Sequence, residues 1–350
     1  MKRLLTLLSV CILAICSCKS TTPLLPSVSG KAGEVIVVMD RDNWEGALGN
    51  DARELLASDC PFLAQREPLY NLVNVSPNGF ADLFKIHRNI VIFNINPQLD
   101  TTGVFYKHNV WANTQVVVQV SAYDTEGAEK LLSENGKTIL SAIEQAERDR
   151  VIINTLKYEE RTIAPEVEKK FGGAMHFPSG YKIKLSKDDF MWIADDKQYV
   201  YQDVFIYKYP AEKDQPFSAE NIIKHRNEML QKYVPGMFEN TYMTTSDFFT
   251  PQIEYIRYKG IHFVQTRGMW DVKNDFMGGP FVSHSFYTPD GKDIMVLEAF
   301  VYAPRYDKRQ YLRQVESSCI LGNGAKIKKR RKNSLSLTKY FLSLQSLFGR

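Results

Sequence analysis

The amino-acid chain begins with a run of residues whose types suit lipid attachment at one cysteine. Two basic residues, Lys2 and Arg3, precede an almost wholly apolar stretch up to Ile15, and the small Ser17 stands directly before Cys18. A basic, then apolar, then small-residue order is typical of a secretory signal. A cysteine at this place predicts a bacterial lipoprotein signal, in which the Cys18 thiol takes a diacylglycerol as a thioether and becomes the first residue of the mature chain.

Two other interpretations of this segment are open, a membrane-spanning helix and an ordinary cleaved signal. The apolar run has roughly a dozen residues, whereas a helix needs about 20 to cross a bilayer. Cys16 competes as a lipidation site, but the bulky Ile15 precedes it where a small residue is needed. We therefore predict Cys18 as the attachment site and the membrane as the partner of its lipid.

One pair of residues has the spacing of half a metal site. His225 and Glu228 stand three apart in a helical pattern, so both side chains share one face. A catalytic zinc needs a third protein ligand, and we favour a solvated helix face as the explanation. The sequence has no HExxH, GxSxG, GxxxxGK[ST] or strand-linked GxGxxG motif. We expect no cofactor and no metal, and we favour a protein that is not an enzyme.

An aromatic alternation marks the segment from Tyr199 to Tyr209, where five of the six odd-numbered positions are aromatic. On a strand these side chains share one face, which would suit an aromatic platform for a glycan or a peptide, with Tyr199 and Tyr201 as binding residues. A sheet face packed against a helix explains the same pattern. We favour that explanation because aromatic residues are enriched in strands.

A second binding candidate is the stretch from Arg267 to Pro280, which crowds glycines, charges and a tryptophan between two expected strands. Long connections carry function more often than regular elements do, and Gly-Gly-Pro allows the backbone to approach a ligand. A structural turn is the simpler interpretation. The binding residues that we name here are Arg267, Trp270, Asp271 and Lys273.

Apolar periodicity predicts the elements of the first half of the chain. Glu34–Met39 and Asn89–Ile95 are β-branched runs typical of buried strands, and a helix beginning near Asp124 is expected to continue to a kink at Pro165 and to join the halves. The other expected elements are a helix from Asn43 to Cys60, a strand over Leu69–Val75, a short helix over Pro77–Ile86 and a strand over Thr114–Ala122.

The second half shows a similar order of strands and helices. Expected elements are strands at Tyr181–Leu185, Phe190–Ala194, Gln198–Tyr209, Gln252–Tyr258, His262–Met269, Val282–Tyr287 and Ile294–Val301, with helices after Ser218 and from Asp307 to Val315. We predict an α+β fold: two similar-sized α/β layers of mostly antiparallel sheet with packed helices, joined by a long helix. The expected divisions are a signal peptide (1–17), a flexible tether (18–32), an N-terminal α+β domain (33–150), a C-terminal α+β domain (151–318) and an atypical basic tail, expected to be disordered (319–350).

Charge is uneven along the chain of 350 residues. The net charge of +4 comes from the two ends, so the body between them is mildly acidic and a nucleic-acid partner is not expected. Cys60 and Cys319 could pair in an oxidising envelope, but sequence alone leaves this open. The basic tail could contact anionic lipid, although an atypical terminus is the interpretation that we prefer.

Several segments together resemble an uncharacterised family of Bacteroidetes lipoproteins, domain-of-unknown-function family 4837. The resemblance covers roughly residues 1–316 and departs from the family pattern after Glu316. It implies an anchored envelope protein, and no catalytic residue can be carried over from it. The residues that carry it are Ser17-Cys18-Lys19, Gly33–Gly49, His87–Pro97 and Arg267–Ser283.

These observations predict a lipid-anchored protein of the bacterial cell envelope, acting as a binding or structural module. Lys19 to Thr22 contain no acid, which favours the periplasmic face of the outer membrane over the cell surface. The alternatives are an envelope hydrolase and a glycan- or peptide-binding protein that uses the aromatic strand. An envelope glycan, peptide or protein is the expected partner beside the membrane.

Overall fold

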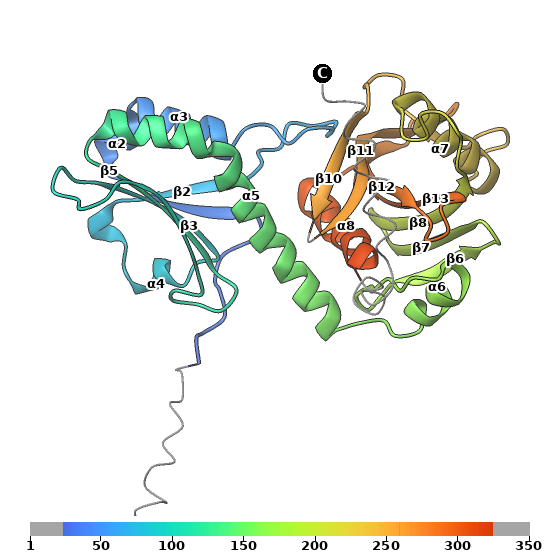
Figure 1. Ribbon diagram of the computed structural model, residues 1–350, viewed down its shortest axis with the longest axis horizontal. Helices are drawn as coiled ribbons and strands as arrows, with labels where there is room; N and C mark the ends of the chain where they lie inside the picture. The colour runs from blue at the N-terminus through green and yellow to red at the C-terminus, as the bar shows by residue number, and fades with distance from the viewer. Residues whose placement is uncertain (1–23, 259, 325–350) are drawn as a thin grey trace, which may run out of the picture.

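The computed structural model describes residues 24–258 and 260–324, which form two units of sheet and helix (Figure 1). The N-terminal unit contains a five-stranded sheet in the order β2-β1-β3-β5-β4. Its strands are β1 (Glu34–Val38), β2 (Asn71–Val75), β3 (Asn89–Ile95), β4 (Gly103–His108) and β5 (Val116–Ala122). Its helices are α2 (Arg41–Glu45), α3 (Ala47–Leu56), the 3-10 turn η1 (Pro77–Gly79), α4 (Asp82–Lys85) and α5 (Thr125–Lys157).

The central strands of this sheet are buried on both faces, as their unbroken Val and Ile content predicts. On one face Val35, Val91 and Val118 pack against α3 and α5. On the other face Ile36 and Ile90 pack against a smaller cluster that includes Phe84 of α4. The sheet is therefore a rigid middle layer between two helical layers.

Helix α5 is the element that links the two units, as the sequence predicts (Figure 1). Asp124 caps it by accepting a hydrogen bond from the backbone N–H of Gly127. The expected continuation through a kink at Pro165 is wrong: α5 ends at Lys157, and a separate helix, α6, covers Ile163–Phe171. Proline is tolerated in the first turn of a helix, where its missing N–H would have no partner. Pro165 therefore lies in the first turn of α6 and does not bend α5.

The C-terminal unit contains an eight-stranded antiparallel sheet in the order β10-β11-β12-β13-β8-β7-β6, with β9 paired to β11. Helix α7 (Ala219–Tyr233) covers one face, and α6 and α8 (Arg309–Gly324) cover the other. The strands are β6 (Lys182–Ser186), β7 (Phe190–Lys197), β8 (Val200–Pro210), β9 (Met243–Thr245), β10 (Gln252–Tyr258), β11 (Ile261–Val272), β12 (Gly278–Tyr287) and β13 (Asp293–Tyr302).

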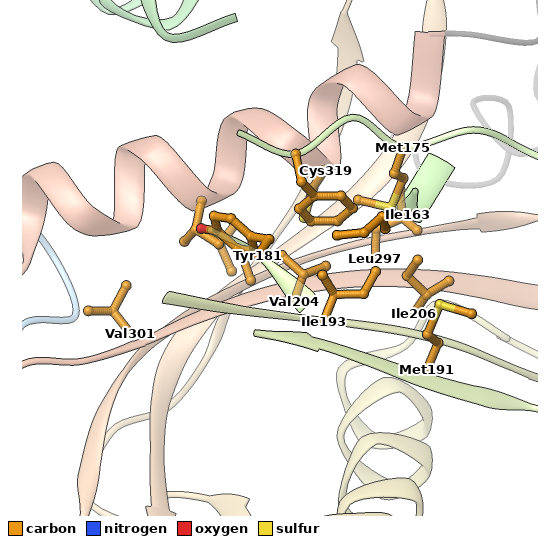
Figure 2. Packing of buried hydrophobic residues seen from close by; sticks show 14 of the residues in the cluster. Ile163, Met175, Tyr181, Met191, Ile193, Val204, Ile206, Leu297, Val301 and Cys319 are labelled. Carbon is orange, nitrogen blue, oxygen red and sulfur yellow. The ribbon is translucent and has the colours of Figure 1, made fainter. Parts of the chain in front are cut away.

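Helix α8 closes the core of the C-terminal unit. Figure 2 shows Cys319 directed from this helix toward Ile193, Val204 and Leu297 of the sheet. The helix continues to Gly324, so it includes residues that the sequence assigned to a disordered tail beginning at 319. The reason is that Leu312, Val315 and Cys319 continue one apolar stripe at helical spacing. Cys60 and Cys319 are free thiols in this structure.

The α+β prediction with a long connecting helix is confirmed. Antiparallel strand pairs predominate over the two sheets together, but the N-terminal sheet departs from this expectation: β1 pairs in parallel with β2 and β3, and β3 with β5. Only β4 is antiparallel to its neighbour there. Helices return the chain between β1 and β2 and between β2 and β3, whereas strand β4 returns it between β3 and β5. The two domain limits stay predictions.

Buried polar contacts join the units. Glu67 of the N-terminal unit accepts hydrogen bonds from the backbone N–H groups of Lys308 and Arg309, at 2.7 and 2.8 Å, and so caps the start of α8. Arg313 of α8 binds Glu144 of α5 through Nη2 and Oε2 at 2.8 Å. In the part of the chain that the structure describes, no helix is long and apolar enough to cross a membrane.

Candidate functional site

A pocket of about 640 Å³ lies between the edge strand β4 and helix α5. Seven of its lining residues belong to α5, two to β4 and four to the loop between β4 and β5. We call this pocket the β4–α5 groove. Its volume is within the range usual for sites that bind small molecules or short chain segments.

Helix α5 supplies the long wall of the groove. Thr138, Ser141, Gln145 and Asp149 recur at intervals of three and four residues, so their side chains form one stripe that continues to Ile153. Ile139 and Ile143 alternate with them and turn to the core of the N-terminal unit. The lining from Thr138 to Ile153 extends for about 22 Å at 1.5 Å per residue. Its chemistry is that of hydroxyl and amide groups together with the Asp149 carboxylate.

Strand β4 supplies the opposite wall. Tyr106 and His108 line the groove, while Val104 on the same face packs toward the core. Among the residues that the structure describes, the buried Tyr106 Oη has no hydrogen-bond partner. Burial raises the pKa of Tyr106, so the phenol stays neutral and keeps a proton to donate.

The loop between β4 and β5 is held against α5 by a buried charge cluster. Arg150 of α5 donates from Nη1 to the carbonyl of Thr114 at 2.5 Å and from Nη2 to Asn89 Oδ1 at 2.6 Å. Glu147 lies 3.0 Å from both Arg150 and Arg88. Burial opposes ionisation of Glu147, but the two guanidinium groups outweigh burial and hold its pKa below the usual range. This cluster therefore fixes the shape of the groove.

One end of the groove reaches the C-terminal unit. The Gln145 Nε2 amide donates to Asp149 Oδ1 at 2.7 Å and to the hydroxyl of Tyr258, on β10, at 2.9 Å. At the other side, the backbone N–H of Asn113 donates to the carbonyl of Pro26 at 2.8 Å. The groove therefore lies beside the junction of the units and beside the first described residues of the chain.

A smaller pocket, of about 280 Å³, lies on the opposite face of the same sheet edge. Phe105 and Lys107 of β4 line it together with Gln119 and Ser121 of β5. Lys107 Nζ donates to Gln119 Oε1 at 3.2 Å. Strand β4 therefore has a pocket on each of its two faces.

The residues named from the Arg267–Pro280 stretch do not converge on one point. Arg267 faces α8, where its Nη2 binds Glu316 Oε1 at 2.6 Å. Trp270 lies on the other face of the same strand, is 3% exposed, and packs in the core under α7. Asp271 and Lys273 lie at the end of β11, where Lys273 N–H donates to the carbonyl of Tyr242. Their binding role stays a prediction.

The aromatic strand is divided between core and surface. Phe205, Tyr207 and Tyr209 belong to the core between the sheet and α7, which is the packing interpretation. Tyr201 is partly exposed and lies 5.4 Å from the ring of Tyr302, and Tyr199 precedes β8 with the Arg305 guanidinium 3.9 Å above its ring. Cys18, the predicted lipid attachment site, lies outside the described residues.

His225 has two carboxylate neighbours. Its Nε2 lies 3.0 Å from Glu212 and its Nδ1 lies 3.3 Å from Glu228, while its ring stacks on Tyr209 at 4.1 Å. Within residues 24–258 and 260–324, no group of three or more His, Cys, Asp or Glu side chains is placed to hold a metal ion.

The β4–α5 groove was not predicted from the sequence because β4 was not predicted. The signal was the short run Val104-Phe105-Tyr106 directly after Gly103, in which β-branched and aromatic residues favour a strand. The polar positions of α5 were seen only as its solvated face. They became a wall of the groove once β4 was placed opposite them.

Comparison with known proteins finds a family model that matches part of each unit. Residues 160–320 match the model of a domain of unknown function (DUF4837). Residues 28–155 match a second domain of unknown function (DUF8532). The resemblance found in the sequence is therefore confirmed for the C-terminal part as a family without known activity, while the N-terminal part matches a separate family model.

No curated protein matches the chain. Four chains of known structure do match. One of them is the crystal structure of human STARD10, at 8% identity, which covers 54% of this chain and 84% of that chain with a TM-score of 0.22. A likeness at this score is too small to support an argument about fold or function.

Proposed function

We propose that this protein is a non-enzymatic binding module of the bacterial cell envelope and that the β4–α5 groove holds its ligand. The observation that carries the proposal is the lining of the groove, in which Thr138, Ser141 and Gln145 face Tyr106. Hydroxyl and amide groups recognise a hydrogen-bonding ligand without having to ionise. Binding is therefore the activity that this lining supports, and the ligand class is polar and hydrogen-bonding, as in a sugar or a peptide.

The lipid anchor and the location belong to the same proposal. We place a diacylglycerol on Cys18, which would hold a Bacteroidetes-type lipoprotein at the periplasmic face of the outer membrane. The apolar run before Ser17-Cys18 and the absence of acids from Lys19 to Thr22 support this placement. Because Pro26 pairs with Asn113 at the rim of the groove, an anchored chain would present the groove close to its tether.

Saturation-transfer NMR tests the binding site. The probe is a mixture of neutral oligosaccharides and end-blocked hexapeptides, added to the mature chain. Ser141→Trp should abolish the transfer signal because an indole at this exposed helix position fills the groove. Ser133→Trp is the matched control, since Ser133 is equally exposed on α5 but does not line the groove. Equal signals from the two variants, or no signal from the unmodified protein, would reject the site.

Metabolic labelling with palmitate tests the anchor. The unmodified chain should take up label, and Cys18→Ala should take up none, because the alanine has no sulfur for the thioether. The control is Cys16→Ala, which keeps Cys18 and should label normally. Label that persists in Cys18→Ala would contradict the assignment of the attachment site.

A further inference from the structure

The outer edge of β4 carries backbone groups that no strand pairs with in the described part of the chain. The register of β4 with β5 continues to Asn109, whose N–H donates to the carbonyl of Gln115 at 3.0 Å. In an antiparallel ladder such bonded pairs alternate with pairs whose N–H and C=O groups point away. By this alternation, the backbone groups of Val104, Tyr106 and His108 point to the open edge.

This edge lacks two features that commonly prevent strand addition, a bulge and a proline. The pairing of β4 with β5 runs from Gly103 to His108 without a bulge, and β4 contains no proline. At the far edge of the other sheet, β6 is interrupted by an irregularity between Ile183 and Leu185. Proteins usually protect exposed edges with bulges, prolines, charged side chains or covering elements, and of these β4 carries the charged Lys107. An edge with a regular ladder beside a groove suggests that the edge is used.

We infer that the ligand of the β4–α5 groove is an extended peptide that pairs with the outer edge of β4 as a sixth strand. This inference rests on the proposed function and names its ligand class. Peptides that add to a sheet edge obtain affinity from main-chain hydrogen bonds and specificity from pockets for alternate side chains. Strand β4 offers the open edge, and the groove on its α5 face offers a place for every second side chain.

The side chains of β4 alternate between the two faces of the sheet. Tyr106 and His108 border the groove on the α5 face, whereas Phe105 and Lys107 lie on the opposite face. Side chains of a strand point alternately to the two faces of its sheet. A peptide paired with β4 would therefore direct every second side chain toward the groove and the others to the face that carries Phe105 and Lys107.

The length of the site sets the length of the peptide. Strand β4 has six residues, which span about 20 Å at 3.3 Å per residue. The α5 wall from Thr138 to Ile153 spans about the same distance. A peptide of about six residues fills both.

The lining of the groove sets the side chains that fit it. Toward α5, Ser141, Gln145 and Asp149 offer hydroxyl, amide and carboxylate groups, which favour polar side chains that donate hydrogen bonds. On the other face, Phe105 and Lys107 of β4 would flank the side chains that point away from the groove.

A backbone methylation scan tests strand addition independently of protein stability. A hexapeptide display library is selected on the mature chain, and the best binder is synthesised with each amide N-methylated in turn. N–H groups that pair with β4 alternate along the peptide, so methylation at every second position should weaken binding at least about fivefold, and methylation between them should not. An even profile would overturn strand addition.

A pair of variants tests the same edge from the protein. Val104→Pro removes the outward N–H of Val104, whereas Val104→Ala keeps it and is the matched control for lost side-chain packing. With both variants folded by circular dichroism, Val104→Pro should weaken peptide binding at least about fivefold relative to Val104→Ala. Equal affinities would overturn the inference.

The outcomes also separate this inference from the proposed function. Oligosaccharide binding that Ser141→Trp abolishes, with no selected peptide, would keep the groove as a site and reject the peptide. Absence of binding by both probe classes would reject the groove and the peptide together.

Discussion

Replacing Arg226 by methionine should destabilise the C-terminal unit more than any surface change can. Arg226 of α7 and Glu298 of β13 are both 0% exposed, and their closest contact joins Nη2 to Oε1 at 2.8 Å. The Nε group lies 3.0 Å from Oε2, and Nη1 donates to Thr245 Oγ1 at 2.8 Å. One side chain therefore joins α7, β13 and β9.

The magnitude follows from the carboxylate that the change leaves behind. Without Arg226, Glu298 is a buried charge whose remaining contact in the described structure is a weak one, with Tyr207 Oη 3.4 Å from Oε2. Breaking a buried pair in this way costs about 3–5 kcal/mol, which is a large part of the roughly 5–15 kcal/mol that stabilises a typical domain. The unfolded population should rise about a hundredfold or more.

The assay is urea unfolding, monitored by hydrogen–deuterium exchange in peptides from β13. These peptides report on the C-terminal unit alone. Arg226→Met combined with Glu298→Leu should recover most of the loss, because both ends then pack among the apolar neighbours Phe281 and Phe300. Lys232→Met is the control on the same helix, since the Lys232–Asp189 pair is exposed and its loss should barely move the midpoint. A small effect of Arg226→Met, or a double variant as unstable as the single, would refute the reasoning.

Three further predictions concern titration and the junction. Burial and the neighbouring charge of Asp196 raise the pKa of Asp203 to about 8, so the folded state holds a proton that the unfolded chain releases at its ordinary pKa near 4. Stability should therefore fall as pH rises from about 4 to about 8, and Asp203→Asn should flatten this thermal-unfolding profile; an unchanged slope would contradict it. Arg313→Met should lower the unfolding midpoint and speed proteolysis between the units, because it leaves Glu144 without its partner on α8; unchanged cleavage would argue against this role. Burial raises the pKa of the Cys60 thiol to about 11 and that of Cys319 also above its ordinary value, so a disulfide reagent at pH 8 should react slowly until urea is added; fast labelling of the folded protein would refute this.

The sequence predicts best those helices and strands whose apolar residues follow the spacing typical of the element. Strands β1 and β3 are unbroken β-branched runs, and α5 and α7 carry apolar stripes beneath a capping Asp124 or Ser218. These patterns follow from the burial of one face of a helix or of both faces of a central strand, and both can be recognised in the sequence. The spacing of apolar residues does not indicate which strands are neighbours in a sheet. The parallel pairing in the N-terminal sheet was therefore not predicted.

The candidate site was beyond prediction for a related reason. Strand β4 is a short edge strand, and its exposed Phe105 and Lys107 break the apolar pattern. Tertiary pairing with β5, rather than local propensity, determines that it is a strand. The residue types of Arg267 and Trp270 suggested one shared site. A spacing of three along a strand places their side chains on opposite faces of the sheet instead.

Helix α5 has three functions at once, and this couples the groove to the junction of the units. One stripe packs on the N-terminal sheet, Glu144 binds Arg313 of α8, and Gln145 faces the groove. The two Gln145 N–H groups already bind Asp149 and Tyr258, so a ligand that accepts from Gln145 replaces one of these bonds. Replacement of the bond to Tyr258 would remove one contact between α5 and β10, where Arg148 of α5 also lies 5.7 Å from the Tyr258 ring. Replacement of the bond to Asp149 would leave these contacts intact, so the bond that a ligand replaces determines whether binding alters the junction of the units.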